Sequence, residues 1–595
     1  MSKTNKLYMG FRTLKQIFTI SPGSCFAILI CSLVAGAYTV LSTYVIGCIF
    51  DNAYLINESI YYKDLFGWYV ELFIAIFIIK NVSEIVINSP RAIGIYSKCA
   101  YVLDANLSNK ITRLPFVFFE LAECLDKLKR AKDTVAANRM QKIFLRSVDI
   151  LVTMLSMIGT LIVLSSYSWI LIPICVLSIL PFYITRKIRG NNMYNLKYFR
   201  SNKRRRANYL WGLFFEIKAI KELRVFNAGK YIYQKWKRQN DELLNEETDF
   251  YKRDTSFVLL CEGIKVLGIL ISIVTLWVMM LNGLFSVGVF AACLNAFYVV
   301  QSSLKGLLEN LSDVRVDLNY AVDYFSMLDM EEETNGETRT CNFNHILSMK
   351  NISFRYPGNK NNVLNNISLD ICKGDKVVIV GENGGGKSTL IKILLGLYKP
   401  QRGKVFVDND DIQQVEPNTY HKLFSIVTQE VNKYVMSIKE NIVMGTFDKE
   451  EIENECLEHK IEAMMKQGEL AYLVDKAGLD SLIGKDFGGI ELSGGEWQKL
   501  AILRAKIRDS DVLVMDEPTA ALDPILETQI LQSFFDDTTD KTIVIVSHRV
   551  GICKFATKIV VMKKGNIIDV GTHEELIKRC EYYRFLYTEQ QKWYI

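Results

Sequence analysis

The chain has 595 residues, half of them hydrophobic, and a formal net charge of +6 at pH 7. Its mean hydropathy is +0.13 although the C-terminal part is hydrophilic, so the surplus of apolar residues must lie in the N-terminal half, which argues against a wholly soluble protein. Basic loops beside membrane spans account for the positive charge, which therefore gives no reason to expect nucleic acid as a partner.

Six apolar windows in the N-terminal half predict membrane helices, each of which needs about 20 residues to cross the hydrocarbon layer. The windows are Ser24–Ile49, Leu65–Ile87, Ile150–Leu164, Trp169–Tyr183, Ser256–Leu281 and Phe285–Leu307. The third and fourth are short and closely spaced, which indicates a tight helical hairpin. Buried helices of a soluble protein are the alternative, but six such runs without amphipathic alternation would overfill a soluble core.

The distribution of charge predicts how these helices are oriented. Four basic residues and no acidic residue precede the first window: Lys3, Lys6, Arg12 and Lys15. The segment Asp51–Asp64 between the first two windows is net acidic. Because cytoplasmic loops carry the excess of Lys and Arg, we expect the N-terminus to be cytosolic. The long basic intervals Arg91–Arg146 and Arg186–Arg253 then face the cytosol as well.

Several charged residues in this half are candidates for contact with a substrate. Glu71, Glu262 and Lys265 fall at or near membrane depth, where ionisable groups are functional candidates by default, although hydration or pairing in a water-filled cavity is the alternative. The basic cluster Lys203–Arg206 is interpreted as a solvated helix face near the membrane, with lipid headgroups or substrate as alternatives.

An acidic segment containing a glycine, Glu331–Thr338, is typical of a linker. We therefore expect a transmembrane domain over residues 1–330, a linker over 331–345 and a globular domain over 346–595. Tyr356 lies on an alternating stretch near the start of this last domain, where its ring would offer a stacking face to a base. A packed strand tyrosine is the alternative.

The most informative motif lies between the apolar run Lys376–Val380 and the helical pattern Leu390–Leu395. A strand, a glycine-rich turn and a helix in this order form a P-loop, whose backbone N–H groups converge on phosphate oxygens. We expect Lys387 to neutralise the β- and γ-phosphates and Ser388 to offer its hydroxyl to Mg²⁺. The predicted nucleotide loop comprises Gly381, Glu382, Asn383, Gly384, Gly385, Gly386, Lys387, Ser388 and Thr389.

Three further strand ends carry catalytic candidates. Asp516 and Glu517 follow four apolar residues, so Asp516 is expected to hold Mg²⁺ through water and Glu517 to orient or deprotonate the attacking water. Gln429 also ends an apolar strand, in reach of Mg²⁺ and that water. His548 ends another and is expected to hydrogen-bond the γ-phosphate. The alternatives are an ordinary acidic pair, a surface glutamine and a structural histidine.

Ser493, Gly494 and Gly495 open a helix, so their amides form a second phosphate-binding terminus. One ATP needs only one such cradle from its own P-loop.

Together these motifs resemble those of the ATP-binding cassette (ABC) proteins over roughly residues 346–580. The stretch Leu492–Gln498 resembles the family's signature, with Glu496 where Gln is commonest, and Asp511–Thr519 resembles its Walker B strand. Tyr356, Gln429, the Ala521–Asp523 segment and His548 match its adenine-stacking aromatic, Q-loop, D-loop and switch histidine. The resemblance implies ATP and Mg²⁺ as cofactors, with Asp523 near the nucleotide, and a head-to-tail dimer with two ATPs at its seam.

The six spans and long cytosolic extensions resemble the exporter-type ABC fold. This resemblance implies an all-α six-helix membrane domain fused to an α/β P-loop ATPase domain. It also implies coupling helices near Leu114–Glu120 and Lys221–Asn227. A soluble ABC protein would lack the spans, and an importer of this family usually keeps its membrane and ATPase parts on separate chains.

We therefore expect an ATP-hydrolysing exporter in a bacterial cytoplasmic membrane, with its ATPase domain in the cytosol. Because every cassette motif is intact, the expected partner is a second copy of the chain, and a heterodimer is the alternative. The weak resemblance of the inner regions to exporters of modified peptides favours a peptide substrate. Multidrug or lipid export stays open, as does an ATP-gated channel or sensor on the same frame.

Overall fold

The computed structural model of this chain describes residues 3–56, 60–167, 169, 172–174, 177, 203–333, 341–446, 455–467, 470–508, 510–517 and 541–592. It divides into two compact units. The first contains Met1–Thr112 and Asp126–Met330, and the second contains Arg113–Leu125 together with Glu331–Ile595. The second unit therefore includes a short segment from the middle of the N-terminal half.

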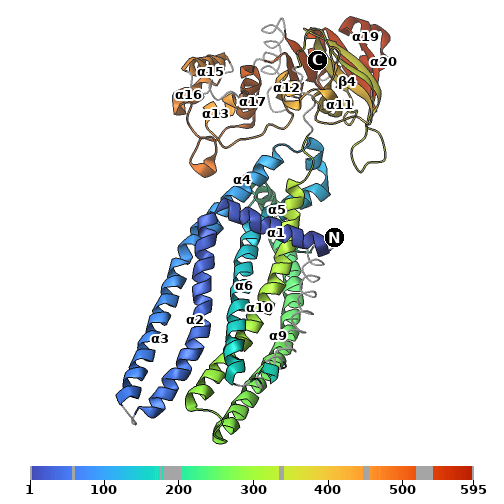
Figure 1. Cartoon of the computed structure of the whole chain (residues 1–595). Helices are drawn as coiled ribbons and strands as arrows, with labels where there is room; N and C mark the ends of the chain where they lie inside the picture. The colour runs from blue at the N-terminus through green and yellow to red at the C-terminus, as the bar shows by residue number, and fades with distance from the viewer. Residues whose placement is uncertain are drawn as a thin grey trace. The chain divides into compact units, whose positions relative to one another are not determined.

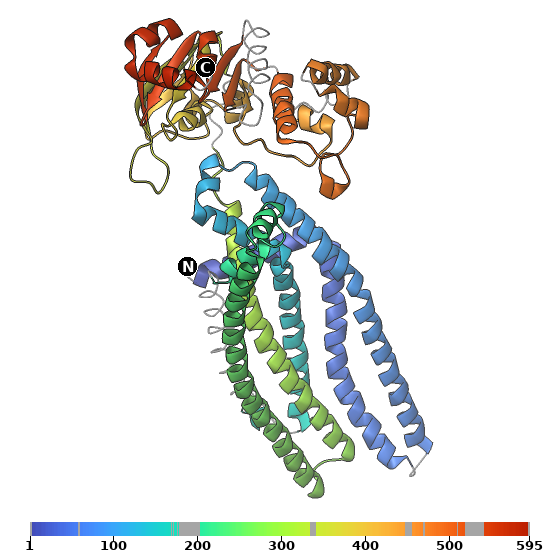
Figure 2. The same ribbon diagram turned by 180° about the vertical axis from the view of Figure 1, so that it is seen from behind.

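The first unit is helical, and its long helices run side by side in both views (Figures 1 and 2). Its described elements are α1 (Lys3–Ile20), α2 (Pro22–Leu55), α3 (Ile60–Val86), the π-helix η1 (Pro90–Lys98), α4 (Cys99–Ile111), α5 (Ala122–Ala136), α6 (Arg139–Tyr167), α8 (Ile217–Val225), α9 (Gly229–Leu281) and α10 (Val287–Leu328). The 53 residues of α9 rise about 80 Å at ~1.5 Å per residue. That length far exceeds the ~30 Å hydrocarbon layer, so α9 must extend beyond it.

Four of the described helices are long and apolar enough to cross a membrane, namely α2, α6, α9 and α10. They carry the first, third, fifth and sixth predicted windows. The second window lies on α3, a 27-residue helix that is not among these four. Most of the fourth window, Trp169–Tyr183, lies outside the described residues. Large apolar side chains such as Phe77 and Leu155 are exposed on this unit, as expected for surfaces that face lipid.

A close approach between α2 and α10 shows why a glycine is needed at the start of α10. The N–H of Gly288 donates to Asp51 Oδ1 over 2.7 Å. A Cβ at Gly288 would come within 2.1 Å of the Gly47 carbonyl oxygen. The two backbones therefore touch at a point where only glycine fits, and the Asp51 carboxylate satisfies one of the free N–H groups at the helix N-terminus.

A cluster of charged side chains joins α6 to α10 outside the predicted membrane spans, before Ile150 on α6 and after Leu307 on α10. The Asp317 side chain is 1% exposed and accepts from Arg139 over 2.9 Å. It also contacts Arg146, whose second amino group lies 2.9 Å from Asp313, a residue that is 41% exposed. Because a buried carboxylate needs compensating partners, these guanidinium groups hold the two helices in one register.

The other charged residues singled out in the sequence are partly paired. Lys203 lies 2.7 Å from Glu246, and Arg205 lies 3.2 Å from Asp126. These exposed pairs fit the interpretation of the basic cluster as a solvated face. Within the predicted fifth and sixth spans, Glu262 contacts Lys305. The Glu71 side chain is exposed on α3.

The second unit contains two sheets. One is four-stranded and antiparallel, in the order β2-β1-β4-β5, and the other is six-stranded, in the order β10-β9-β3-β8-β7-β6. In the larger sheet β6, β7, β8, β3 and β9 are parallel, and β10 is antiparallel to β9. The strands are β1 (Ile346–Phe354), β2 (Leu364–Cys372), β3 (Lys376–Gly381), β4 (Arg402–Val407), β5 (Asp410–Asp411), β6 (Phe424–Val427), β7 (Val512–Asp516), β8 (Thr542–Val546), β9 (Lys558–Lys563) and β10 (Asn566–Gly571).

The central strands β3, β7 and β8 of the larger sheet are mostly apolar and almost completely buried, as is usual when helices cover a parallel sheet. A second group of helices, α13 and α15 to α17, lies together beside the sheets (Figure 1) and has its own apolar core around Trp497 and Leu500. The helices of the second unit are η2 (Phe116–Glu120), α11 (Lys387–Leu394), η3 (Ile412–Gln414), α12 (Pro417–Lys422), α13 (Ile438–Val443), α15 (Glu455–Gln467), α16 (Ala471–Ala477), η4 (Lys485–Phe487), α17 (Gly494–Ile507), η5 (Val550–Phe555), α19 (His573–Arg579) and α20 (Glu581–Gln591).

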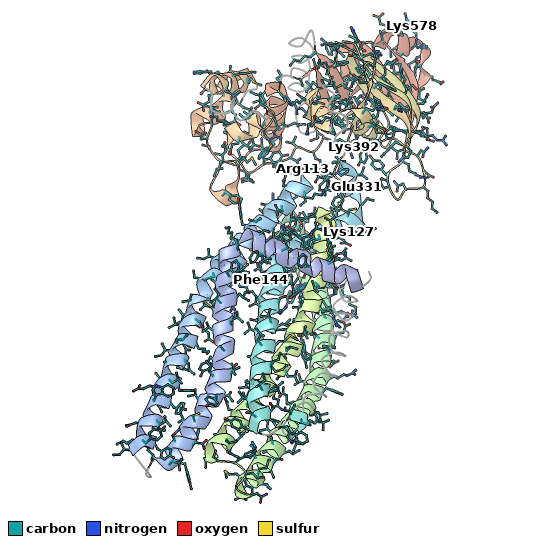
Figure 3. All side chains as sticks on the ribbon, viewed as in Figure 1. Arg113, Lys127, Phe144, Glu331, Lys392 and Lys578 are labelled. Atoms are coloured by element: carbon teal, nitrogen blue, oxygen red, sulfur yellow. The ribbon has the colours of Figure 1, made fainter. Side chains whose placement is uncertain are left out.

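The short helix η2 packs on the apolar core of the second unit. The Phe116 ring meets the Tyr398 ring edge-on, with centroids 5.5 Å apart. Lys392, labelled in Figure 3, lies 3.6 Å from Glu120 and 5.9 Å from the centroid of the Phe116 ring. An aromatic contact and an ion pair therefore fix the segment that was predicted to contain the first coupling helix.

We expect Asp317→Asn to lower the thermal unfolding midpoint of the purified protein, because it leaves two partly buried guanidinium groups without their shared carboxylate. Asp313→Asn is the matched control, since it removes the same charge one turn away from a more exposed site. The measurement is a melting curve in detergent for both variants. Equal midpoints for the two variants would contradict a special role for the buried carboxylate.

Candidate active site

The predicted catalytic residues meet at one edge of the six-stranded sheet. Strands β3, β6, β7 and β8 run parallel, so their carboxyl ends lie at the same edge. Each strand is followed there by a predicted site residue or by the P-loop itself. Because these strands are buried and regular, they fix the positions from which the polar side chains emerge.

The P-loop leaves β3 and enters α11. Gly384 and Gly386 have φ angles of +75° and +96°, a region that favours glycine. A Cβ at Gly386 would also lie 2.8 Å from Leu364 Cδ2. The ammonium group of Lys387 donates to the carbonyls of Gly381 and Glu382 over 3.0 and 2.9 Å. The loop therefore curls around its own lysine and leaves the N-terminus of α11 facing the cavity.

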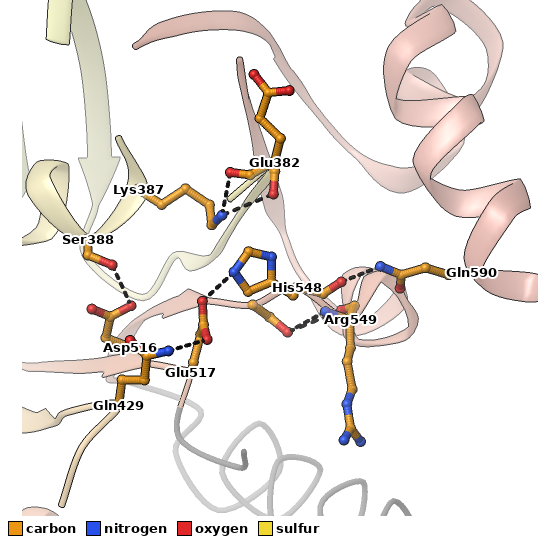
Figure 4. A network of polar contacts seen from close by, with 11 residues as sticks. Glu382, Lys387, Ser388, Gln429, Asp516, Glu517, His548, Arg549 and Gln590 are labelled. Atoms are coloured by element: carbon orange, nitrogen blue, oxygen red, sulfur yellow. Dashed lines mark hydrogen bonds and ion pairs between the residues drawn. The ribbon is translucent and has the colours of Figure 1, made fainter. Parts of the chain in front are cut away.

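The acidic pair at the end of β7 has two different environments (Figure 4). Asp516 accepts a hydrogen bond from the Ser388 hydroxyl over 3.2 Å. Glu517 accepts from Gln429 Nε2 over 2.8 Å and contacts His548 Nε2 with its other oxygen. The backbone of Glu517 has a φ of +47°, an unusual conformation for a residue other than glycine that turns the chain sharply at the strand end.

Burial and neighbouring charges shift the pKa values of this group. Burial lowers the pKa of Lys387, and the nearby carboxylates of Glu517, Asp516 and Glu382 oppose that shift. Burial raises the pKa of Asp516, which the Ser388 hydrogen bond opposes. Burial and Lys387 lower the pKa of His548, and the contact with Glu517 opposes that shift. Two carboxylates, an ammonium group and an imidazole at one point are typical of a reactive site.

A cavity of about 360 Å³ opens between these groups. Its lining consists of Val363, Asn383, Gly384, Gly385, Gly386, Lys387, Ser388, Thr389, Gln429, Glu517 and His548. Phosphate groups placed here would meet backbone N–H groups, an ammonium group and the N-terminus of a helix. The cavity is thus suited to a triphosphate chain, with Glu517 positioned to act on a water molecule beside it.

The site also fits the expected Mg²⁺. Among the described residues no cluster of three or more His, Cys, Asp or Glu side chains is arranged to hold a metal. Mg²⁺ does not require one, because it keeps several waters and is usually bound through one or two carboxylates plus substrate phosphates. The Ser388 hydroxyl and the Asp516 carboxylate supply hard oxygen ligands 3.2 Å apart.

Not every predicted residue lines the cavity. Tyr356 is half-buried, its hydroxyl lies 3.0 Å from Thr389 Oγ1, and its ring packs edge-on against Phe354 and Tyr398. It therefore lies beside the P-loop without lining the cavity. Asp523 lies outside the described residues.

The signature residues are also absent from the cavity lining. Ser493 caps α17, where its hydroxyl accepts from the Glu496 N–H over 3.3 Å and its own N–H donates to Glu496 Oε2 over 2.5 Å. This capping box gives a physical reason for Glu496 at a position where the family usually has Gln. The helix N-terminus predicted to bind phosphate is well formed, and the cavity of this chain does not use it.

Two residues near the site, Val363 and Gln590, were not predicted from the sequence. Val363 lines the cavity although it follows an exposed loop without a motif. Gln590, near the end of α20, donates to the carbonyl of His548. Neither residue belongs to a motif of fixed spacing. The contact between Gln590 and His548 joins residues 42 positions apart, and no pattern in the sequence predicts it.

Comparisons with known proteins agree with this geometry. Residues 364–520 match the family model described as "ABC transporter". The chain is 27% identical to the subtilin transport ATP-binding protein of Bacillus subtilis, over 96% of this chain and 92% of that protein. It is 30% identical to the nisin transport ATP-binding protein of Lactococcus lactis, over 68% of this chain and 67% of that protein.

The fold also matches a solved structure almost from end to end. A bacterial Atm1-family ABC exporter with ATP bound superposes with a TM-score of 0.75, covering 95% of this chain and 98% of that chain at 19% identity. Apolar helices and bacterial relatives indicate a bacterial cytoplasmic membrane protein. The family match, the relatives and the fold together show that this chain belongs to the ABC transporter family, as an exporter-type half-transporter that couples ATP hydrolysis to export.

Proposed function

We propose that two copies of this chain form an exporter that moves a peptide out of the bacterial cytosol. The observation that carries this proposal is the match to the subtilin transport protein, which extends over 96% of the chain and therefore includes the membrane part. The match to the nisin transport protein supports the same substrate class. Since substrates of exporters are recognised by the membrane part, a match restricted to the cassette would carry less weight.

Lipid and drug export are the alternatives. The chain is 32% identical to a lipid A-core flippase of Photobacterium profundum, but over only 51% of its length. A putative multidrug export protein of Bacillus subtilis matches over 83% at 26% identity. The greater coverage by the subtilin transport protein favours a peptide. A channel or sensor on the same frame would hydrolyse ATP without moving a substrate.

The geometry of the site supports a division of roles among its residues. Lys387 binds the β- and γ-phosphates, and Ser388 and Asp516 hold Mg²⁺, Asp516 through water. The bound Mg²⁺ supplies charge stabilisation at the phosphates. Glu517 orients the attacking water, while Gln429 and His548 hold that carboxylate in place. Gln429 also reaches Mg²⁺ and this water, and His548 hydrogen-bonds the γ-phosphate. Tyr356, which lies beside the P-loop residue Thr389, stacks on adenine.

The proposed partner is a second copy of the chain. The signature helix α17 presents a capped N-terminus that the cavity of its own chain does not use. In the first unit, no described residue of α8 is buried, and its last residue, Val225, and the following Phe226 are 81% and 75% exposed. Apolar residues exposed at the predicted second coupling helix are expected to dock on the partner's cassette.

ATP binding at both seams draws the two cassettes together, and hydrolysis separates them again. The coupling segments transmit this movement to the membrane helices. The N-terminus and the cassettes face the cytosol, which is supported by the basic residues before the first span and by the extension of α9 beyond the membrane thickness. The substrate cavity lies between the two membrane halves.

We expect Glu517→Gln to bind ATP normally and to hydrolyse it about 100-fold more slowly or worse, because the water loses its orienting carboxylate. A closed, ATP-filled state should accumulate. Hydrolysis and nucleotide occlusion are measured in lipid, with Glu574→Gln, an exposed carboxylate on α19, as the control. Unchanged turnover in Glu517→Gln would assign the water to another residue.

We expect complementation between Lys387→Ala and Ser493→Arg if each ATP lies between the P-loop of one chain and the signature of the other. Neither mutant homodimer has a sound seam, whereas a mixed dimer combines both defects at one seam and leaves the other intact. A purified mixed dimer with two different tags should therefore occlude one ATP. Occlusion no higher than in the mutant homodimers would refute the composite site.

We expect ATPase activity of the protein in lipid vesicles to be stimulated several-fold by peptides that contain apolar and cationic residues. The same panel should include lipids and cationic drugs, and Glu517→Gln serves as the background control. Stimulation by lipids or drugs alone would replace the peptide proposal with one of its alternatives. Accumulation of peptide inside inverted vesicles separates a pump from a channel or sensor.

A further inference from the structure

The C-terminal hairpin α19–α20 packs against the segment that follows the switch histidine. Tyr583 of α20 is fully buried, and its hydroxyl lies 2.7 Å from His573 Nδ1. It shares one apolar core with Val550, Ile552 and Cys553 of η5, the short helix that begins two residues after His548. The hairpin is therefore anchored directly behind the switch loop.

From this anchored helix, Gln590 reaches the backbone on both sides of Arg549, the residue directly after His548 (Figure 4). Its Nε2 donates to the His548 carbonyl, and its Oε1 accepts from the Val550 N–H over 2.8 Å. One amide side chain thus bridges the backbone across Arg549, whose own N–H donates to Ser547 Oγ over 2.9 Å. Val550 is also the first residue of η5. The amide oxygen of Gln590 therefore accepts from one of the free N–H groups at the start of that helix.

The other end of α20 approaches the P-loop. Burial and the nearby Glu382 carboxylate raise the pKa of the Tyr582 hydroxyl, and Lys563 Nζ lies 4.3 Å from the centroid of the Tyr582 ring. Helix α20 therefore lies close to both the P-loop and the loop after β8, although none of its own residues lines the cavity.

We propose that Gln590 is a positioning residue that holds His548 at the correct distance from Glu517 and the γ-phosphate. The His548 ring contacts Glu517, and its placement depends on the backbone that Gln590 holds. Because a displacement of about 1 Å at a reacting group can cost up to ~100-fold in rate, loss of this clamp should affect hydrolysis more than binding. The inference rests on the role proposed above for His548.

The test compares Gln590→Ala and Gln590→Glu with Gln591→Ala in the full-length protein in lipid. Gln591 is the same residue type at the next position and is exposed. Gln590→Glu keeps the size and the acceptor for Val550 but loses the donor to His548, so it reports on the clamp even if the alanine variant folds poorly. Single-turnover hydrolysis, followed for hours to capture slow rates, and the apparent affinity for ATP are measured, and each variant is also made with His548→Ala.

We expect both Gln590 variants to hydrolyse ATP about tenfold more slowly, with the affinity for ATP changed less than twofold, while Gln591→Ala behaves as the parent. With His548→Ala present, the Gln590 substitutions should cause no further loss, because the ring that they displace is gone. Unchanged rates, or an equal loss in both backgrounds, would overturn the proposal. A normal rate in His548→Ala alone would instead refute the role of His548, and with it any action of Gln590 through that ring.

Discussion

Parallel pairing of β3, β6, β7 and β8 is the constraint on which the rest of the ATPase unit depends. A parallel sheet places all of its carboxyl ends at one edge, so residues far apart in the sequence meet there. Lys387, Gln429, Glu517 and His548 come from four different segments and line one cavity. The backbone hydrogen bonds that join these strands therefore fix the relative positions of the four site residues.

Contacts within the chain also hold the groups at this edge together. The Lys387 ammonium binds two carbonyls of its own loop, and the Glu517 carboxylate is shared by Gln429 and His548. These contacts satisfy charges that burial would otherwise penalise. A triphosphate chain in the cavity would exchange these contacts for contacts of its own, so binding would reorganise the residues predicted to carry out hydrolysis.

Much of this could be predicted from the sequence, since its strongest signals are local. The spacing of Gly381 to Thr389 between a strand and a helix specifies a P-loop by itself, and the apolar runs before Asp516 and His548 specify strands that end at the same edge. The membrane windows follow from composition alone. The roles assigned to the individual site residues remain predictions.

Contacts between distant segments could not be predicted. The two hydrogen bonds of Gln590 connect a helix to a loop about 40 residues earlier, and nothing about a glutamine near a chain end indicates such a partner. The edge-on packing of Tyr356 against Tyr398 likewise depends on tertiary structure. Sequence patterns report which face of an element is apolar, but they do not report which element covers it.

The inclusion of residues 113–125 in the second unit has a consequence for how this architecture can evolve. The chain leaves the helical unit, contributes Phe116 and Glu120 to the surface around Tyr398 and Lys392, and returns. A recombination event near residue 330 would therefore separate this segment from the surface it fits. An exchange of cassettes between relatives preserves this contact only if residues 113–125 are exchanged together with the cassette. Substitutions on the two sides of the contact are therefore expected to accumulate together.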